Sequence, residues 1–261
     1  MKTFNYHVAK DSKEASKLTS SSSVFLAGGI TSIPSLKLGL ATYKDVIDIK
    51  HIKKLSGIKV SSKSVTIGAT TKHTEVANSK DVKKAIPSLA KLASRIGDAQ
   101  VRNRGTIGGS IANNDPSACY PSACMALNAT IHTNKRKIEA SKFFKGMFET
   151  ALKKGELIES VEFQIPEKSN YQKHPNPASR YAIVGVYLAK HKKEVNVAVT
   201  GAKSAVYIDK DLSKALSSSF SVSAIDGMEL DNSEMNTDIH ASGEYRASLV
   251  LTYTKKAVEA C

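Results

Sequence analysis

Residues 100–116 carry the side chains and backbone most suited to holding a ligand. Their sequence is QVRNRGTIGGSIANNDP, in which three glycines alternate with small hydroxyl and amide residues, downstream of two arginines. Glycine permits a positive φ and close approach of another group, and successive N–H groups in such a turn form a concave nest for phosphate. The segment therefore predicts an anion site, with pyrophosphate as the expected anion. A glycine-rich surface turn is the plainer alternative.

A second turn of similar composition lies upstream. Residues 24–27 are a short apolar run typical of a buried strand, and Gly28 and Gly29 end it. Thr31 follows, and Pro34 can open a short helix. Free N–H groups gather where a strand delivers a glycine turn to the start of a helix, so this is again a place for phosphate. Two such turns in one chain predict a ligand with two phosphates that is held from both sides.

Neither turn belongs to a standard nucleotide motif, and no catalytic constellation stands out. The chain has no G-x-x-x-x-G-K-[ST] and no G-x-G-x-x-G, which disfavours a P-loop enzyme and a Rossmann site. It has no G-x-S-x-G elbow and no H-E-x-x-H pair, which disfavours a serine hydrolase and a zinc enzyme. His73, followed by Glu75, is interpreted as a surface residue of a helix. We therefore expect a bound cofactor to do the chemistry while the protein binds and orients it.

The paired motifs AGGIT (residues 27–31) and TIGG (residues 106–109) resemble those of the FAD-binding medium subunit of molybdenum hydroxylases. That family includes aerobic carbon monoxide dehydrogenase and xanthine dehydrogenase, and this chain looks closest to the carbon monoxide dehydrogenase-like branch. The resemblance implies an FAD-binding domain of the vanillyl-alcohol-oxidase (PCMH) type, in which both turns hold the FAD pyrophosphate. Further matching blocks are IGATTKHTEVA (67–77), QVRNRGTIGGSIANNDP (100–116), NPASRYAIVGVYLAK (176–190) and DIHASGEYRASLV (238–250).

The resemblance also carries residue roles onto this chain. Ile30 stands where many relatives have a polar residue, so it should contribute through its backbone. Cys119 stands where many relatives place an aspartate that contacts the ribose or phosphate region, and Arg180 and Lys173 are the candidates for a basic residue near the isoalloxazine. The implied cofactor-binding residues are Ala27, Gly28, Gly29, Ile30, Thr31, Ser32, Thr106, Ile107, Gly108, Gly109, Ser110, Asn114, Asp115 and Cys119. The resemblance implies no catalytic residue and no metal ligand in this chain.

The resemblance further implies a division of labour among subunits. A large partner would hold molybdopterin and oxidise the substrate, and a small partner would hold two [2Fe–2S] clusters. This chain would collect the electrons on FAD and deliver them to an external acceptor, within a dimer of heterotrimers. A stand-alone FAD-dependent oxidase of the same superfold is the alternative. A basic nucleic-acid-binding module is a third hypothesis, supported only by the positive net charge.

Composition agrees with an ordinary globular chain. The 261 residues contain 38 Lys and Arg against 24 Asp and Glu, a net charge of +14, but the lysines are scattered among apolar residues. No apolar run is long enough for a membrane span, and the N-terminal residues show no apolar signal segment. We therefore expect a cytoplasmic protein that does not bind nucleic acid.

Three cysteines are too few for a disulfide framework and too few for an iron–sulfur cluster, which commonly takes four cysteine ligands. We interpret Cys119 as a packing residue without redox function, because its neighbours in the sequence supply no cation to stabilise a thiolate.

The predicted fold class is α+β. We expect an FAD-binding domain at 1–166, with lobes of about 1–55 and 56–166, and a small α+β C-terminal domain at 167–261. Apolar residues recur at i, i+3, i+4 and i+7 from Leu89, and Pro87 stands in the first turn, which predicts an amphipathic helix over 87–96 leading into the glycine-rich segment. Residues 167–179 contain two prolines and directly follow a third, Pro166, which predicts an irregular connection between domains. Further expected elements are strands at 46–49, 65–69 and 161–165, hairpins at 130–140 and 182–199, and helices at 211–216 and 243–258.

Overall fold

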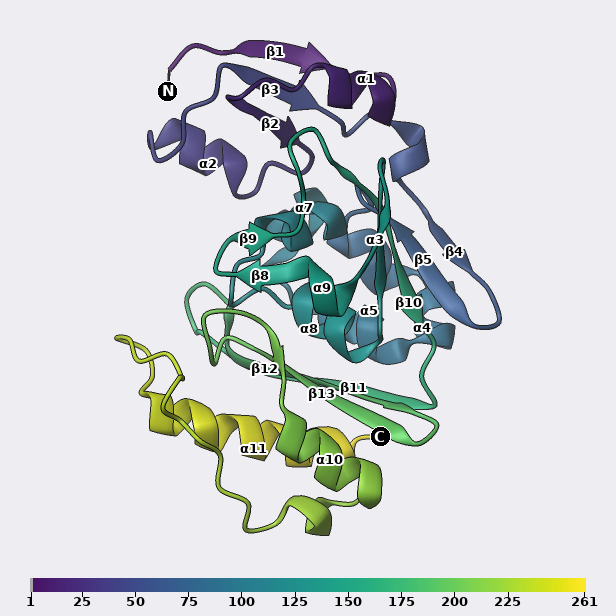
Figure 1. Cartoon of the computed structure of the whole chain (residues 1–261), viewed down its shortest axis with the longest axis vertical. Coiled ribbons are helices and arrows are strands. Elements are labelled where there is room, and N and C mark those ends of the chain that lie inside the picture. Colours follow the sequence, from purple (N-terminus) through teal and green to yellow (C-terminus); the bar gives the residue numbers. More distant parts are fainter. Residues whose placement is uncertain (1) are drawn as a thin grey trace.

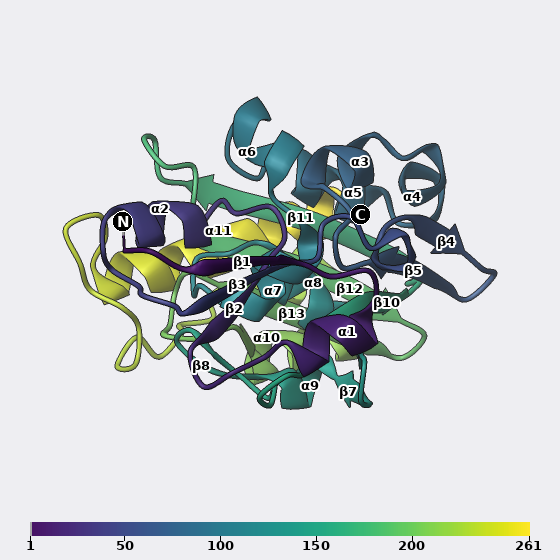
Figure 2. The ribbon, with the colours of Figure 1, turned by 90° about the horizontal axis from the view of Figure 1, so that it is seen from above.

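The computed structural model describes residues 2–261, in which the three larger sheets are stacked along the long axis of the molecule (Figure 1). An N-terminal lobe lies at one end, a larger antiparallel sheet with its helices lies in the middle, and a C-terminal sheet covered by a short and a long helix lies at the other end. Seen from above, the N-terminal sheet lies over α7, the helix that begins in the second glycine-rich turn (Figure 2). Helices and strands alternate irregularly, so the predicted α+β class is confirmed.

The N-terminal lobe is a small parallel sheet with the strand order β1-β3-β2. The central strand β3 buries Val46 and Ile47, as expected for a strand with neighbours on both sides. At its end, buried Asp48 accepts a hydrogen bond from Tyr6 and pairs with Lys50 at 2.7 Å. The elements are β1 (Asn5–Val8), α1 (Ser12–Lys17), β2 (Ser23–Leu26), α2 (Ser32–Lys37) and β3 (Asp45–Asp48).

The middle layer is a five-stranded antiparallel sheet with the order β4-β5-β10-β6-β7. Its central strand β10 buries alternate residues Val161 and Phe163 against helices, which explains the alternating pattern in the sequence. The elements are η1 (Lys53–Leu55), β4 (Ile58–Val60), β5 (Ser64–Gly68), α3 (His73–Asn78), α4 (Lys80–Ala85), α5 (Pro87–Ser94), α6 (Ala99–Arg104), α7 (Ile107–Asn113), α8 (Tyr120–Ala126), β6 (Thr130–Thr133), β7 (Lys137–Glu139), α9 (Ala140–Phe143), β8 (Phe144–Gly146), β9 (Glu149–Thr150) and β10 (Ile158–Gln164).

The C-terminal layer is a four-stranded antiparallel sheet with the order β11-β12-β13-β14. One face packs on α5 and α8, and the other packs on α10 and α11. Because both faces are covered, β12 is buried along most of its length: Tyr187 joins the core of the middle layer and Leu188 joins the C-terminal core. The elements are β11 (Lys168–Pro175), β12 (Ala182–His191), β13 (Glu194–Thr200), β14 (Tyr207–Ile208), α10 (Lys210–Ser218), η2 (Val222–Ile225) and α11 (Gly243–Glu259).

The expected irregular connection at 167–179 is wrong, because β11 occupies Lys168–Pro175. This strand pairs with β12 over its whole length, and its buried members include Asn170, Tyr171 and Lys173. Polar residues at buried positions hid the period-two pattern of a strand. The other expected elements are confirmed, including the helix that starts at Pro87, both hairpins and the last two helices.

Within residues 2–261, no helix is both long and apolar enough to cross a membrane. No group of three or more His, Cys, Asp or Glu side chains in the same range is arranged to hold a metal ion.

Gly108 provides a test of how α7 packs on β5. A Cβ on Gly108 would lie 2.5 Å from the Cβ of Ala69 and 2.7 Å from its carbonyl oxygen. We expect Gly108→Ala to lower the free energy of unfolding by about 1–3 kcal/mol, the usual cost of forcing an atom into a packed interior. Urea unfolding of the full chain measures this.

Gly109→Ala is the matched control, because its Cβ would meet only the hydroxyl of Thr106, at 3.0 Å. This variant should unfold at nearly the same urea concentration as the wild type. Equal midpoints for the two alanine variants would contradict the packing role of Gly108.

Candidate functional site

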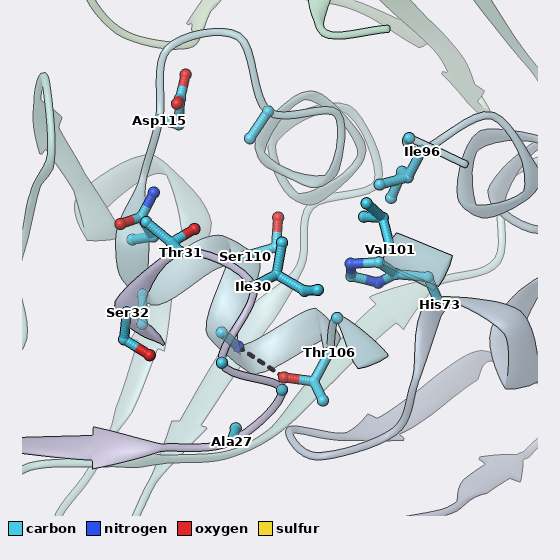
Figure 3. A pocket seen from close by; sticks show the side chains of 18 of the residues that line it. Ala27, Ile30, Thr31, Ser32, His73, Ile96, Val101, Thr106, Ser110 and Asp115 are labelled. Carbon is cyan, nitrogen blue, oxygen red and sulfur yellow. Dashed lines mark hydrogen bonds between the residues drawn. The ribbon is translucent and has the colours of Figure 1, made fainter. Parts of the chain in front are cut away.

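A cavity of about 420 Å³ lies where the N-terminal lobe, the second glycine-rich turn and the loop before β12 meet (Figure 3). This volume is within the range of small-molecule and cofactor sites. Both glycine-rich turns reach it, although they are far apart in the sequence. Its walls include Val24, Phe25, Ala27, Gly28, Gly29, Ile30, Thr31, Ser32, Tyr43, His73, Ile96, Gly97, Val101, Gly105, Thr106, Gly109, Ser110, Asp115, Ser117, Cys119, Ser179, Arg180 and Tyr181.

The first turn presents unused hydrogen-bond donors at the cavity. Within the described chain, the backbone N–H groups of Gly28, Gly29, Ile30 and Thr31 donate to no other protein group. The turn needs glycine because Gly29 has a φ of +75°, in the left-handed region. Four consecutive free N–H groups at a cavity wall, just before the start of α2, form an anion-binding nest.

The two turns contact each other through glycine. A Cβ on Gly28 would lie 2.1 Å from the carbonyl oxygen of Arg104 and 3.0 Å from the Cα of Gly105. Any side chain at Gly28 would therefore push the turns apart. The contact places the free N–H groups of the first turn beside the start of α7.

The second turn uses the N–H groups of residues 107–109 internally, so the predicted nest of successive free donors in this turn is wrong. These groups anchor the start of α7 to the end of β5 and to Thr106, whose side chain caps the helix (dashed line in Figure 3). This turn therefore offers the cavity the hydroxyls of Thr106 and Ser110 in place of backbone donors. The internal bonds are Ile107 N–H to Thr71 O (3.2 Å), Gly108 N–H to Ala69 O (2.8 Å) and Gly109 N–H to Thr106 Oγ1 (3.2 Å).

Three of the expected site residues lie away from the cavity surface. Ile107 is buried in the core, and Gly108 packs on Ala69. Asn114 ends α7 in the left-handed conformation, and its amide donates to the carbonyls of the β8–β9 hairpin. The expected residues that line the cavity are Ala27, Gly28, Gly29, Ile30, Thr31, Ser32, Thr106, Gly109, Ser110, Asp115 and Cys119.

His73 is a cavity residue that the sequence did not reveal. Its side chain is only 4% exposed, so the surface position expected for it is wrong. The ring packs beside Gly105, where a Cβ would come within 2.6 Å of Nε2, and lies 5.4 Å from the ring of Tyr120. Burial lowers the pKa of His73 to about 4, and the charge of Arg102 adds to the effect. His73 is therefore neutral at pH 7.

Cys119 has a cation beside it, contrary to the expectation from its sequence neighbours. The Nζ of Lys173 lies 3.6 Å from the Cys119 sulfur, in a buried position. The two residues meet because β11 packs on α5 while α8, which follows Cys119, packs on the neighbouring strands β12 and β13 of the same sheet. The two residues are far apart in the sequence, so the neighbours of Cys119 in the chain do not reveal this pair.

The two basic candidates near the expected isoalloxazine differ in position. Arg180 lines the cavity, whereas Lys173 lies behind the wall and is only 2% exposed. Asp115 and Tyr181 also line this wall, and burial raises the pKa of the Asp115 carboxyl and of the Tyr181 hydroxyl.

The cavity fits the FAD that the resemblance implies. The nest at Gly28–Thr31 and the hydroxyls of Thr106 and Ser110 suit the two phosphates. Apolar side chains on the same walls, including Ile96 and Val101 (Figure 3), suit flat ring systems. The arrangement can bind, orient and partly shield a dinucleotide.

A protein-family model described as the FAD binding domain in molybdopterin dehydrogenase matches residues 2–167. The glyceraldehyde dehydrogenase medium chain of Sulfolobus acidocaldarius is 39% identical over 170 residues, which cover 63% of this chain and 60% of that protein. The carbon monoxide dehydrogenase medium chain of Hydrogenophaga pseudoflava is 30% identical over 278 residues, which cover 98% of this chain and 96% of that protein.

Solved structures agree with these sequence matches. Carbon monoxide dehydrogenase from Hydrogenophaga pseudoflava, in a form lacking the Mo-pyranopterin moiety, superposes with a TM-score of 0.85 at 27% identity over 99% of this chain and 97% of that chain. Reconstituted carbon monoxide dehydrogenase from Oligotropha carboxidovorans superposes with a TM-score of 0.88 at 25% identity over 99% and 97%. The resemblance read from the sequence is therefore confirmed.

Ile30 tests whether the first turn binds through its backbone. Ile30→Pro removes one free N–H donor from the nest, so we expect FAD to bind at least tenfold more weakly. Ile30→Ala keeps the N–H group and should change the affinity less than threefold. Flavin fluorescence titration of the full chain measures both, with far-UV circular dichroism to check folding. Similar affinities for the two variants would rule out the backbone contact.

His73 predicts an acid-sensitive contribution to stability. The unfolded chain takes up a proton near pH 6.5, whereas folded His73 does so only near pH 4. The unfolded state therefore binds more protons between these values, and stability is lost as the pH falls from 6.5 to 4. At about 1.4 kcal/mol per pKa unit, the loss reaches up to about 3 kcal/mol.

We expect His73→Gln to remove much of this pH dependence when urea unfolding is measured at several pH values. His51→Gln, at an exposed position, should leave the dependence unchanged. An unchanged slope in His73→Gln would show that His73 is not the group responsible.

Proposed function

This chain belongs to the family of FAD-binding domains of molybdopterin dehydrogenases, and we propose that it is the electron-transfer flavoprotein of a molybdenum hydroxylase complex. Its cofactor is FAD, and it is similar to carbon monoxide dehydrogenase medium chains over nearly its whole length. The observation that carries the proposal is the nest of free N–H groups at Gly28–Thr31, which faces the same cavity as Thr106 and Ser110.

We propose the following roles for the cavity residues. The N–H groups of Gly28–Thr31 bind the pyrophosphate, and the hydroxyls of Thr106 and Ser110 donate to its oxygens. Ile107, Gly108 and Asn114 act indirectly, because they hold α7 and the following loop in place. The remaining expected residues, Ala27, Ser32, Gly109, Asp115 and Cys119, shape the walls.

The boundary between the proposed FAD-binding domain (1–166) and C-terminal domain (167–261) falls between β10 and β11. Two residues beyond this boundary, Tyr171 and Tyr187, belong to the same apolar core as the middle layer. The C-terminal domain therefore supports the cavity from behind, and Ser179–Tyr181 contribute directly to its wall.

The proposed complex contains a molybdopterin-binding large subunit and a small subunit with two [2Fe–2S] clusters. Several relatives are named as medium chains, medium subunits or subunits of a dehydrogenase complex, which supports a multi-subunit assembly. We propose a dimer of such heterotrimers that reduces an external acceptor. Bound FAD supplies the chemistry at this junction, since a flavin accepts one or two electrons, and the chain holds and orients it.

Rapid mixing tests the proposed function. We expect the assembled complex to show bleaching of flavin absorbance when its substrate is added, because electrons reach FAD from the partner subunits. The isolated, FAD-loaded chain should show no bleaching with the same substrate. Bleaching by the isolated chain, free of iron and molybdenum, would instead support a stand-alone oxidase.

A further inference from the structure

We propose that Lys173 is a positioning residue whose buried ammonium group fixes the Arg180 loop on the wall of the FAD cavity. Lys173 lies on β11, one layer behind the cavity, and none of its atoms lines that cavity. Its effect must therefore pass through the groups that it contacts. This inference rests on the proposed placement of FAD in the cavity.

The ammonium group of Lys173 joins three separate segments. It donates to the carbonyl of Arg95 at 2.6 Å and to the carbonyl of Arg180 at 2.9 Å, and it contacts the sulfur of Cys119 at 3.6 Å. Arg95 follows α5, Cys119 precedes α8, and Arg180 belongs to the loop between β11 and β12. Each of these segments contributes to the cavity wall, through Ile96 and Gly97, through Cys119 itself, or through Ser179–Tyr181.

A charge this deeply buried must be compensated. Lys173 is 2% exposed, and burial lowers the pKa of its ammonium group. Two carbonyl acceptors and a thiol satisfy all three N–H donors of the charged form. The same bonds hold the carbonyls of Arg95 and Arg180 pointed toward the ammonium group. Turning either carbonyl away would leave both partners of a buried hydrogen bond unsatisfied, which is costly.

The Arg180 carbonyl is the contact with the clearest consequence. Arg180 has a φ of +63°, a left-handed conformation that costs a residue with a Cβ about 1–2 kcal/mol. Asn176 closes the rest of the loop, since its side chain accepts from Ala178 and Ser179 and its carbonyl accepts from Arg180. The bond from Lys173 adds the constraint on the Arg180 carbonyl that these contacts leave free. Without it, relief of strain would rotate Arg180 and move the adjacent cavity residues.

Lys173→Met tests this role, because methionine keeps the length of the side chain and removes the charge and donors. We expect FAD to bind at least tenfold more weakly to the full chain, measured by fluorescence titration. Lys168→Met is the matched control: Lys168 lies on the same strand but is exposed and does not line the cavity. Its affinity for FAD should stay within twofold of the wild type.

Two substitutions at Arg180 separate positioning from general destabilisation. Arg180→Gly and Arg180→Ala both remove the side chain, but only glycine adopts a positive φ without strain. In the Lys173→Met background, Arg180→Gly should bind FAD at least threefold more tightly than Arg180→Ala. Damage to the core by methionine would not be repaired by glycine.

Each outcome decides the inference. If Lys173→Met binds FAD within twofold of the wild type while Ile30→Pro loses it, the positioning role is wrong and the cavity assignment stands. If Ile30→Pro and Lys173→Met both bind normally, the cavity assignment itself is wrong. If Lys173→Met does not fold, the two Arg180 variants are compared in a Lys173→Leu background, which also lacks the donors. Weaker binding by the alanine variant supports the role, and equal affinities overturn it.

Discussion

The contact between Gly28 and the Arg104 carbonyl is the constraint on which the proposed FAD cavity depends. A Cβ at Gly28 would lie 2.1 Å from that oxygen, so the N-terminal lobe can approach the middle layer only through glycine. This approach brings the end of β2 beside the start of α7 and encloses the cavity between them. The N-terminal sheet has its own small core, around Ile47, Ile49 and Leu55, and therefore adds a preformed wall. The proposed binding site is thus a junction between two lobes with largely separate cores, which are joined where Leu157, next to β10, packs with the N-terminal cluster.

The two glycine-rich turns use their backbone N–H groups differently. In the turn at Thr106–Gly109, the N–H groups of residues 107–109 hold α7 against the end of β5 and complete the helix cap. The turn at Gly28–Thr31 lines the cavity, and its N–H groups donate to no other group of the described chain. The internal hydrogen bonds of the second turn fix the position of α7 at the cavity. The free N–H groups of the first turn can bind an anion. Similar residue composition therefore serves two different physical purposes.

The C-terminal layer closes the cavity from behind and is part of the same core. Tyr171 and Tyr187 pack with the helices of the middle layer, while the opposite face of the sheet packs on α10 and α11. Burial of both faces is what allows Lys173 to sit in the interior, where its donors are satisfied by groups from three segments. The loop at Ser179–Tyr181 then reaches the cofactor cavity with a defined conformation.

The sequence by itself determined the features that depend on local patterns. The glycine turns, the amphipathic helix at Pro87–Ser94 and the hairpin of β12 and β13 follow from residue type and short-range spacing, and the paired motifs identified the family. Only the tertiary structure decided which N–H groups stay free, that β11 is a strand, and that His73 is buried. The contact between Lys173 and Cys119 is likewise visible only in the tertiary structure. Burial and hydrogen-bond partners depend on segments distant in the chain, so residues near in sequence cannot reveal them.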